Sequence, residues 1–444
     1  MIILLLSAAL EFFCNNHVST KTTSSFNTAY FFYINGSFTL LQQEHSCIVK
    51  VVMSERRTSM LIFIYAIIII AFLDTFIQLP IIAPYATELG ASSFLTGMII
   101  AIYSLSNMIG NAISGHWIDR YGRKKMLLFG MGFVAVALLF YPLAQSGWGL
   151  FWSRLFHGLA GGALIPAAFA YLGDLAPSRR RGKTMAFSGA CIGTAAIIGP
   201  AFGGIMSARL SVDTIFYFVA VLFFITGIVA FIWLKESSKS FERKAVDMKD
   251  ILPLLRNPIM LQALISAFAL MMSMGVLAYA LPLKVESLSL STAVTGLLLS
   301  SFGIVALIIF LSPLNRLFDR YSPSLIILIG MGLISFSLIS LSQLQSIEMI
   351  AIIMLIYGVG FSFIFPSMNR MVLDISTSYN RGKAFGLFYA CFSLGVVFGS
   401  SFSGAISDAF GQPLFISGLI MVGLALTFFI LFRNHHQSLQ PKMH

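Results

Sequence analysis

Twelve long apolar segments follow one another along this chain of 444 residues, and short loops between them carry most of the charges. Each segment has about 20–27 residues, enough to cross the ~30 Å hydrocarbon core of a bilayer as a helix. A backbone in lipid must satisfy its own hydrogen bonds, so the segments are expected to be helical. We predict an all-α membrane protein whose twelve transmembrane helices lie near residues 59–84, 95–117, 126–145, 148–173, 184–207, 213–234, 258–283, 294–315, 324–343, 347–372, 383–407 and 412–432.

The composition agrees with a membrane protein and argues against soluble classes. Hydrophobic residues make up 58% of the chain and charged residues 10%, whereas about 25% of a soluble protein is charged. The net charge of +11 could indicate nucleic-acid binding, but the basic residues lie in short loops, as membrane topology requires. The four cysteines lack metal-ligand spacing, and no motif of a soluble enzyme is visible. We expect no nucleic-acid partner, no metal and no enzymatic activity.

Residues 1–52 differ from the rest of the chain. Their short apolar run at 2–10 lacks a preceding basic region, and a polar stretch without periodicity follows it. Met53 then opens a short basic lead-in, MSERRTSM, directly before the first long apolar segment. We expect translation to start at Met53, with residues 1–52 either absent from the mature protein or disordered. N-terminal sequencing of the expressed protein tests this expectation.

The distribution of basic residues predicts the topology. The loops with basic clusters all fall on one side of the predicted membrane, at residues 56–57, 120–125, 179–183, 235–256, 316–320, 370–383 and 433. Only Arg209 and Lys284 lie on the other side. This asymmetry predicts a multi-pass protein of the cell (plasma) membrane with both termini in the cytoplasm.

The chain contains an internal repeat of six segments. The sequence DLAPSRRRGKTMAF at Asp174 matches DISTSYNRGKAFGL at Asp374, an offset of 200 residues that also pairs Gly158 with Gly358. A charged linker at 235–257 separates an N-terminal six-helix bundle (53–234) from a C-terminal one (258–432), and a tail follows at 433–444. Two pseudo-symmetric bundles with a binding site between them near the midplane are a known transporter arrangement.

The loop between the second and third segments carries the sequence GHWIDRYGRKK at residues 115–125. It resembles the loop signature of the major facilitator superfamily, and seven positions match: Gly115, Asp119, Arg120, Gly122, Arg123, Lys124 and Lys125. The resemblance implies the major facilitator fold. It further implies that Asp119 and Arg123 join a charge network that locks the outward-facing state, with Asp174 as the partner. Arg120 and the two lysines are interpreted as topological anchors.

The fourth segment carries Arg154, about two helical turns into the predicted membrane. Because arginine stays charged in proteins, it needs an anionic partner or a water-filled cavity. Arg154 and Gly158 match the spacing of the superfamily's fourth-segment signature. Apart from His116 at the very end of the second segment, His157 is the only histidine within the predicted segments, and the titration range of histidine suits proton transfer. The alternative for His157 is a hydrogen-bonded packing residue.

The fifth segment contains GTAAIIGPAFGG, with Pro200 expected to kink the helix. Gly199 and Gly203 form a small-residue face suited to close helix contact. The stretch resembles the motif that marks proton-coupled exporters in the superfamily; the alternative is a general packing face. The residues concerned are Gly193, Gly199, Pro200, Gly203 and Gly204.

A wall of aromatic and methionine residues is predicted to line the substrate cavity. Tyr357, Phe361, Phe365 and Asn369 recur every four residues on one helix face. Met272 belongs to a methionine-rich part of the seventh segment, and methionine surfaces adapt to varied lipophilic guests. Ordinary packing is the alternative.

Asp74 is the only acid near the middle of any predicted segment. A charged Asp at bilayer depth costs about 2.5–3.5 kcal/mol. The stretch LDTFIQLP resembles the twelve-span drug:proton antiporters, including tetracycline exporters, in which the first segment carries an acid before a proline. We therefore predict that Asp74 couples transport to protons together with Arg154 and His157. Gln78, one turn further, is predicted to hydrogen-bond the substrate.

These features predict a monomeric, proton-coupled secondary transporter that exports lipophilic or amphiphilic compounds (multidrug or antibiotic efflux) by alternating access. Its partners would be a small-molecule substrate, protons and the lipid bilayer, and it would need no cofactor beyond the proton motive force. Three alternatives stay open: an uptake symporter for sugars or metabolites, an exporter of one endogenous compound such as a siderophore or lipid, and a membrane enzyme.

Overall fold

The computed structural model describes residues 39–176, 181–236, 252–376 and 381–439. Its contacts divide the chain into two units, residues 1–59 and residues 60–444. In the first unit, the described residues from Thr39 onward belong to helix α2. The N-terminal stretch before residue 39 lies outside the described residues, so the prediction about residues 1–52 stays a prediction.

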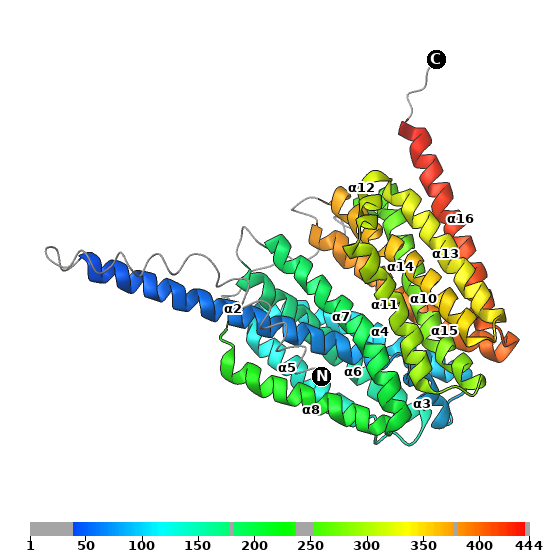
Figure 1. Cartoon of the computed structure of the whole chain (residues 1–444), viewed down its shortest axis with the longest axis horizontal. Coiled ribbons are helices and arrows are strands. Elements are labelled where there is room, and N and C mark those ends of the chain that lie inside the picture. Colours follow the sequence, from blue (N-terminus) through cyan, green and yellow to red (C-terminus); the bar gives the residue numbers. More distant parts are fainter. Residues whose placement is uncertain (1–38, 177–180, 237–251, 377–380, 440–444) are drawn as a thin grey trace, which may run out of the picture. The chain divides into compact units, whose positions relative to one another are not determined.

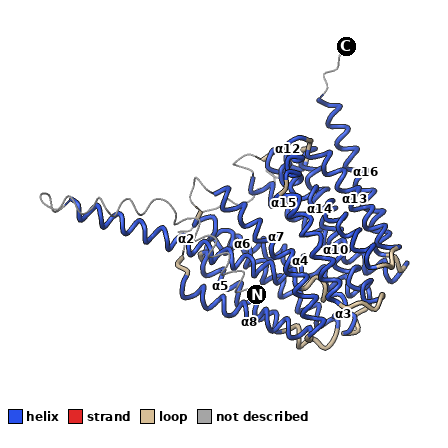
Figure 2. The backbone as a smooth tube through the Cα atoms, in the orientation of Figure 1, coloured by secondary structure: helices blue, strands red, loops and turns tan. Residues whose placement is uncertain are grey.

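Helices and short connections make up the described part of the chain (Figures 1 and 2). The elements are α2 (Thr39–Ile77), α3 (Ile82–Glu88), α4 (Ser93–Tyr121), α5 (Arg123–Leu139), α6 (Gly147–Leu175), α7 (Arg181–Arg209), α8 (Val212–Trp233), α9 (Leu252–Leu255), α10 (Pro258–Ser287), α11 (Thr292–Leu311), η4 (Pro313–Arg316), α12 (Leu317–Arg320), α13 (Pro323–Gln343), α14 (Ile347–Ile375), α15 (Arg381–Phe410) and α16 (Pro413–Leu439).

Eleven helices among the described residues are long and apolar enough to cross a membrane. The remaining predicted segment, the third along the chain at 126–145, corresponds to α5, which has only 17 residues. At 1.5 Å per residue this helix is about 26 Å long, near the lower limit for a membrane span. The predicted segment was too long because the helix ends at Leu139 and a turn follows it.

The first predicted segment is broken in two. Helix α2 ends at Ile77, a turn contains Pro80, and α3 begins at Ile82. Proline lacks a backbone N–H and clashes with the preceding helical turn, which accounts for the break. In this part of the repeat the offset is 198 residues, which aligns Pro84 with Pro282. Helix α10, the counterpart in the second half, therefore has Ala278 at the position of Pro80, and it runs without interruption.

The helices of the two halves pack in equivalent ways. In the first half α4 and α5 pack on α6, and α5 also packs on α8. In the second half α11 and α13 pack on α14, and α13 also packs on α16. An offset of about 200 residues converts one set into the other, so the sequence repeat is a repeat of tertiary packing.

Two helix pairs make most of the contacts between the halves, α4 with α15 and α7 with α11. At each crossing two glycines meet: Gly97 approaches Gly404, and Gly204 approaches Gly296. A Cβ atom on Gly97 would lie 2.5 Å from the Ser400 carbonyl oxygen, so side chains there would push the helices apart. We call these contacts the outer glycine pairs, because they lie at the helix ends opposite the basic loops.

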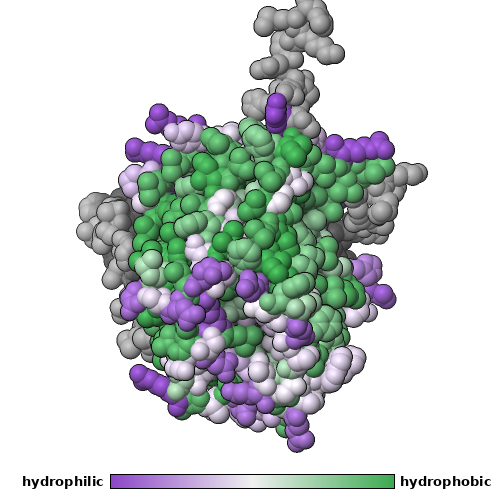
Figure 3. Space-filling model, turned by 90° about the vertical axis from the view of Figure 1, so that its right-hand side faces the viewer, coloured by the Kyte–Doolittle hydropathy of each residue, from purple (hydrophilic) through white to green (hydrophobic). Residues whose placement is uncertain are grey.

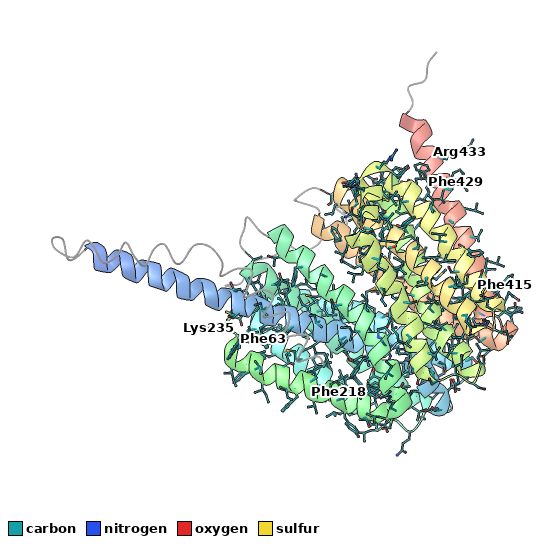
Figure 4. All side chains as sticks on the ribbon, in the orientation of Figure 1. Phe63, Phe218, Lys235, Phe415, Phe429 and Arg433 are labelled. Carbon is teal, nitrogen blue, oxygen red and sulfur yellow. The ribbon has the colours of Figure 1, made fainter. Side chains whose placement is uncertain are left out.

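The outer surface of the second unit is hydrophobic. In Figure 3 hydrophobic residues cover the upper and middle part of one face, and hydrophilic residues gather at its top edge and over its lower part. Phe218 on α8 and Phe429 on α16 project outward (Figure 4), and 40% and 41% of their side chains are exposed. Such a surface is expected where a protein faces lipid tails.

Candidate functional site

The charged and polar residues predicted in the first and fourth segments lie together inside the first half. Asp74 comes from the end of α2, Gln78 directly follows this helix, and Arg154 and His157 come from α6. All four side chains are buried, with 3% of Asp74 and none of His157 exposed. Together with Tyr103 of α4 and Tyr141, which follows α5, they form what we call the buried polar cluster.

Asp74 has a partner at each carboxylate oxygen. The Gln78 side chain donates a hydrogen bond to Oδ1 over 2.8 Å. His157 Nε2 lies 2.9 Å from Oδ2. A buried carboxylate needs such partners because burial otherwise disfavours its charged form.

Arg154 meets Asp74 indirectly, through an amide. Its Nη1 donates to Gln78 Oε1 over 2.6 Å, and its Nε donates to the Ile99 carbonyl oxygen over 3.2 Å. Its guanidinium also lies 4.6 Å from the centre of the Tyr103 ring, a cation–π contact. Gln78 therefore bridges a fixed cation and a titratable anion. Both ends of its amide are bonded, and its predicted role toward the substrate stays a prediction.

Within the described part of the second half, the cluster has no charged counterpart. The repeat pairs Asp74 with Met272, and His157 with Tyr357. Tyr357 is fully buried and shares a 2.8 Å hydrogen bond with Ser273. The neutral residues Met272 and Tyr357 thus occupy the positions of Asp74 and His157, and among the described residues the buried charges of this cluster lie in one half of the repeat.

The predicted aromatic and methionine wall divides into two groups. Met272 and Tyr357 are buried within the second half. Phe361 and Phe365 stack on each other with ring centres 5.7 Å apart, and 37% of Phe365 is exposed. The Asn369 amide donates to the Phe365 carbonyl oxygen. Their role in a substrate cavity stays a prediction.

The basic loop motif forms the turn between α4 and α5. Gly122 adopts a φ of +97°, a backbone conformation that favours glycine. At Gly115 the packing does not require glycine, because an added Cβ atom would meet open space. Arg123 Nε lies 2.9 Å from Asp174 Oδ2, which is the contact that the resemblance implied. Arg120 stacks on the neighbouring Tyr121 ring at the exposed rim. The side chain of Asp119 lies outside the described residues.

Glu236 is a residue of this loop site that sequence reasoning missed. Its Oε1 accepts hydrogen bonds from the backbone N–H groups of Arg123 and Lys124, over 2.7 and 3.1 Å. These are unpaired donors at the start of α5, where an anion is favoured. The available signal was that Glu236 is the first acid after the sixth apolar segment, at the basic side of the membrane.

The glycine motif of α7 contacts two different helices. Gly199 and Gly203 pack against α2: a Cβ on Gly199 would lie 2.6 Å from Phe76 Cβ, and one on Gly203 would collide with the Ile77 carbonyl oxygen. Gly204 faces α11 in the other half. A Cβ added to Gly193 would meet open space, and Pro200 is buried inside the helix.

The family follows from a comparison of the whole chain with known proteins. The model of the Major Facilitator Superfamily matches residues 64–283 and 263–443, so the chain belongs to this superfamily. It is a multi-pass membrane transporter and not an enzyme.

Several relatives are named multidrug resistance proteins. Multidrug resistance protein 2 of Bacillus subtilis is 25% identical over 377 residues, covering 81% of this chain and 92% of the relative. Multidrug resistance protein MdtG of Salmonella paratyphi A is 25% identical over 344 residues, covering 75% and 85%. One similar solved structure is that of a bacterial homologue of the human lysosomal transporter Spinster, in an inward-facing and unoccupied conformation. It superposes on this chain with a TM-score of 0.73 at 13% sequence identity. The match covers 87% of this chain and 99% of that structure. At this identity the likeness shows the fold alone.

Proposed function

We propose that this transporter exports lipophilic or amphiphilic small molecules in exchange for protons. The observation that carries the proposal is the contact of Asp74 with His157, 2.9 Å apart and buried in a membrane helix bundle. A titratable acid inside a membrane span is costly and points to a proton pathway. The relatives that are named multidrug resistance proteins support the direction and the substrate class.

The charges of the cluster suggest how proton and substrate binding exclude each other. Ionised Asp74 balances the charge of Arg154 through Gln78. A proton on Asp74 removes this balance and leaves a net positive charge in the low-dielectric interior. Such a state favours rearrangement of the bundle or release of a cationic guest. The Arg123–Asp174 ion pair is proposed to stabilise one of the two access states at the basic side.

The driving force sets the size of the expected effect. A pH difference of one unit supplies about 1.4 kcal/mol per proton, which supports a roughly tenfold gradient of a monovalent cation in one-to-one exchange with protons. Proteoliposomes with an acidic lumen should therefore accumulate a fluorescent lipophilic dye such as ethidium.

The test compares wild type with Asp74→Asn under this gradient. Asp74→Asn should abolish gradient-driven accumulation, because the amide cannot take up the transported proton. Asp374→Asn is the matched control, because Asp374 is an aspartate whose side chain is 62% exposed; it should accumulate dye like wild type. Dye accumulation in proteoliposomes whose outer solution is acidic, with a lumen of higher pH, would indicate symport instead of exchange. No dye transport by wild type would favour an exporter of one endogenous compound.

A further inference from the structure

A polar pocket on the second half of the transporter has no role in the proton exchange proposed above. It lies on the side opposite the basic loops, where α10, α13 and α15 end and α16 begins, and its volume is about 290 Å³. None of the described residues that line it is acidic. The pocket is therefore polar and carries a positive charge, and its polar lining residues are Tyr279, Lys284, Ser287, Ser342, Ser407 and Gln412.

Lys284 supplies the charge of this pocket. Its Nζ donates one hydrogen bond, to the Ser342 carbonyl oxygen over 3.3 Å, and no ion pair involves Lys284 within the described part of the chain. An ammonium group has three donors, so two remain for water or a ligand. At the offset of 198 residues, Lys284 corresponds to Ala86, which is fully buried. The duplicated fold therefore does not require a cation at this position.

The start of α16 adds further donors to the pocket. Pro413 and Leu414 line the pocket and begin this helix. The first N–H groups of a helix have no partner within it, and a helix start favours an anion. Two acids adjoin lining residues in the sequence, Glu286 and Asp408, but both are exposed and neither lines the pocket. The chemistry of the pocket thus suits an anionic group such as a phosphate.

A second hollow, which we call the α13–α16 groove, lies between these two helices on the exposed surface and has a volume of about 390 Å³. Its lining includes Leu328, Gly332, Ile339, Val422, Ala425 and Phe429. A Cβ on Gly332 would meet open space, so this glycine helps to keep the groove open. Phe429 projects outward at its edge (Figure 4). The one polar side chain among the lining residues, Ser335, donates to the Met331 carbonyl oxygen over 2.8 Å, so the groove is apolar.

The groove and the pocket lie along the same faces of two helices. On α13, Ser342 of the pocket lies about one turn beyond Ile339 of the groove. On α16, Leu414 of the pocket and Val422 of the groove are eight residues apart, which also places them on one face. From Leu328 to Ile339 the groove is about 16 Å long at 1.5 Å per residue, close to the ~15 Å of hydrocarbon in one leaflet. A molecule with an anionic head and an apolar chain as long as a leaflet is deep would fill both.

We propose that the pocket and the groove together bind one anionic phospholipid of the leaflet opposite the basic loops, with its phosphate at Lys284 and an acyl chain in the groove. A zwitterionic phospholipid carries its own cation, for which the lining residues offer no carboxylate. A basic residue near a membrane surface raises the affinity for anionic lipid about fivefold. This inference concerns a lipid that stays bound, and it does not depend on the proposed proton exchange.

Native mass spectrometry of the purified protein in detergent micelles tests the role of the charge. The probes are dioleoyl phosphatidylglycerol and dioleoyl phosphatidylcholine, which share their chains and differ in net charge. Wild type should bind the anionic lipid about fivefold more tightly. Lys284→Gln should remove this preference, and Lys284→Arg should keep it. The matched control is Arg209→Gln, because Arg209 is exposed and is the other basic residue predicted on this side; this variant should keep the preference.

A second variant tests the groove. Gly332→Leu should fill the groove without a backbone collision, and the anionic lipid should then lose most of its affinity. Gly132→Leu is the matched control, because Gly132 is the repeat counterpart of Gly332 on α5 and its Cβ would also meet open space. The control should bind the lipid like wild type. Unchanged lipid binding by Gly332→Leu would contradict the placement of the acyl chain.

Three further results would overturn the proposal. Equal affinity of wild type for the two lipids would exclude the role of the charge. Displacement of phosphatidylglycerol by glycerol 3-phosphate would identify a soluble anion as the ligand. An unchanged lipid preference of Lys284→Gln, together with altered dye accumulation, would assign the pocket to the transported substrate. The binding measurements need no pH gradient, so their failure would leave the proposed proton exchange standing.

Discussion

At the residue scale, Gln78 explains how two opposite charges are kept in one buried site without touching. A direct ion pair would leave several hydrogen-bonding positions of Asp74 and Arg154 to be satisfied elsewhere, which is costly in a low-dielectric interior. The amide instead donates to Asp74 and accepts from Arg154. Gln78 follows the last residue of α2, where the Pro80 turn begins. A small change of backbone at this turn would alter both contacts at once.

Gln78→Leu should therefore destabilise the fold. The change leaves an Arg154 N–H and an Asp74 oxygen without partners, and each unsatisfied buried group costs about 1–3 kcal/mol. Thermal unfolding in lipid nanodiscs measures the effect. Gln343→Leu is the control, because Gln343 is exposed and surface changes usually stay within about 0.5 kcal/mol. Equal stability of the two variants would contradict the bridging role.

At the scale of elements, α7 and α15 use glycines to hold the helices that carry the site or its counterpart. Gly199 and Gly203 bring α7 against the end of α2, next to Gln78. In the second half, a Cβ on Gly399 would collide with the carbonyl oxygen of Met272, the repeat partner of Asp74. The glycine face thus sets the position of the end of α2, which carries Asp74, in the first half and of an apolar residue in the second.

Gly203→Ala should displace α2 and impair coupling. Its Cβ would collide with the Ile77 carbonyl oxygen, a backbone atom that cannot move without its helix. We expect lower thermal stability and reduced dye accumulation under a pH gradient. Gly189→Ala on the same helix is the control, because its Cβ would meet open space. That variant should keep activity and gain up to about 1 kcal/mol from helix propensity. Similar behaviour of both variants would refute the packing explanation.

At the scale of the whole transporter, residues 60–444 hold their two halves together at the outer glycine pairs. Polar contacts accompany both crossings: Ser207 donates to Thr292 over 2.9 Å, and the Phe94 N–H donates to Asp408 over 3.1 Å. The Arg123–Asp174 ion pair lies within the first half. The structure contains this ion pair while both outer glycine pairs are in contact. Alternating access requires the outer crossings to separate, because transporters of this kind move one repeat against the other.

A disulfide across one crossing should arrest the cycle. Ser207→Cys combined with Thr292→Cys in a cysteine-free background should oxidise readily, because the native side-chain oxygens are 2.9 Å apart. Dye accumulation should fall to the level of empty liposomes and return after reduction. Each single variant should transport whether oxidised or reduced. Full transport by the crosslinked protein would show that this crossing does not open.

The sequence alone determined the features that depend on composition, period and internal similarity. Apolar length defined the membrane segments, the 200-residue offset defined the two halves, and a charge in an apolar run singled out Asp74, Arg154 and His157. Each of these signals comes from a single stretch of the chain or from a comparison between two stretches of the same chain. The Arg123–Asp174 contact could be predicted only through the resemblance to a family.

Tertiary structure decided which side chains meet. His157 and Asp74 are 83 residues apart, and their contact depends on how α6 packs against the end of α2. The bridging by Gln78, the hydroxyl of Tyr141 at His157, and Glu236 at the start of α5 carry no signal in composition or period. A hydrogen bond requires two atoms within about 3 Å, and in this protein the packing of neighbouring helices sets those distances. Sequence therefore located the buried charges, while helix packing determined their partners.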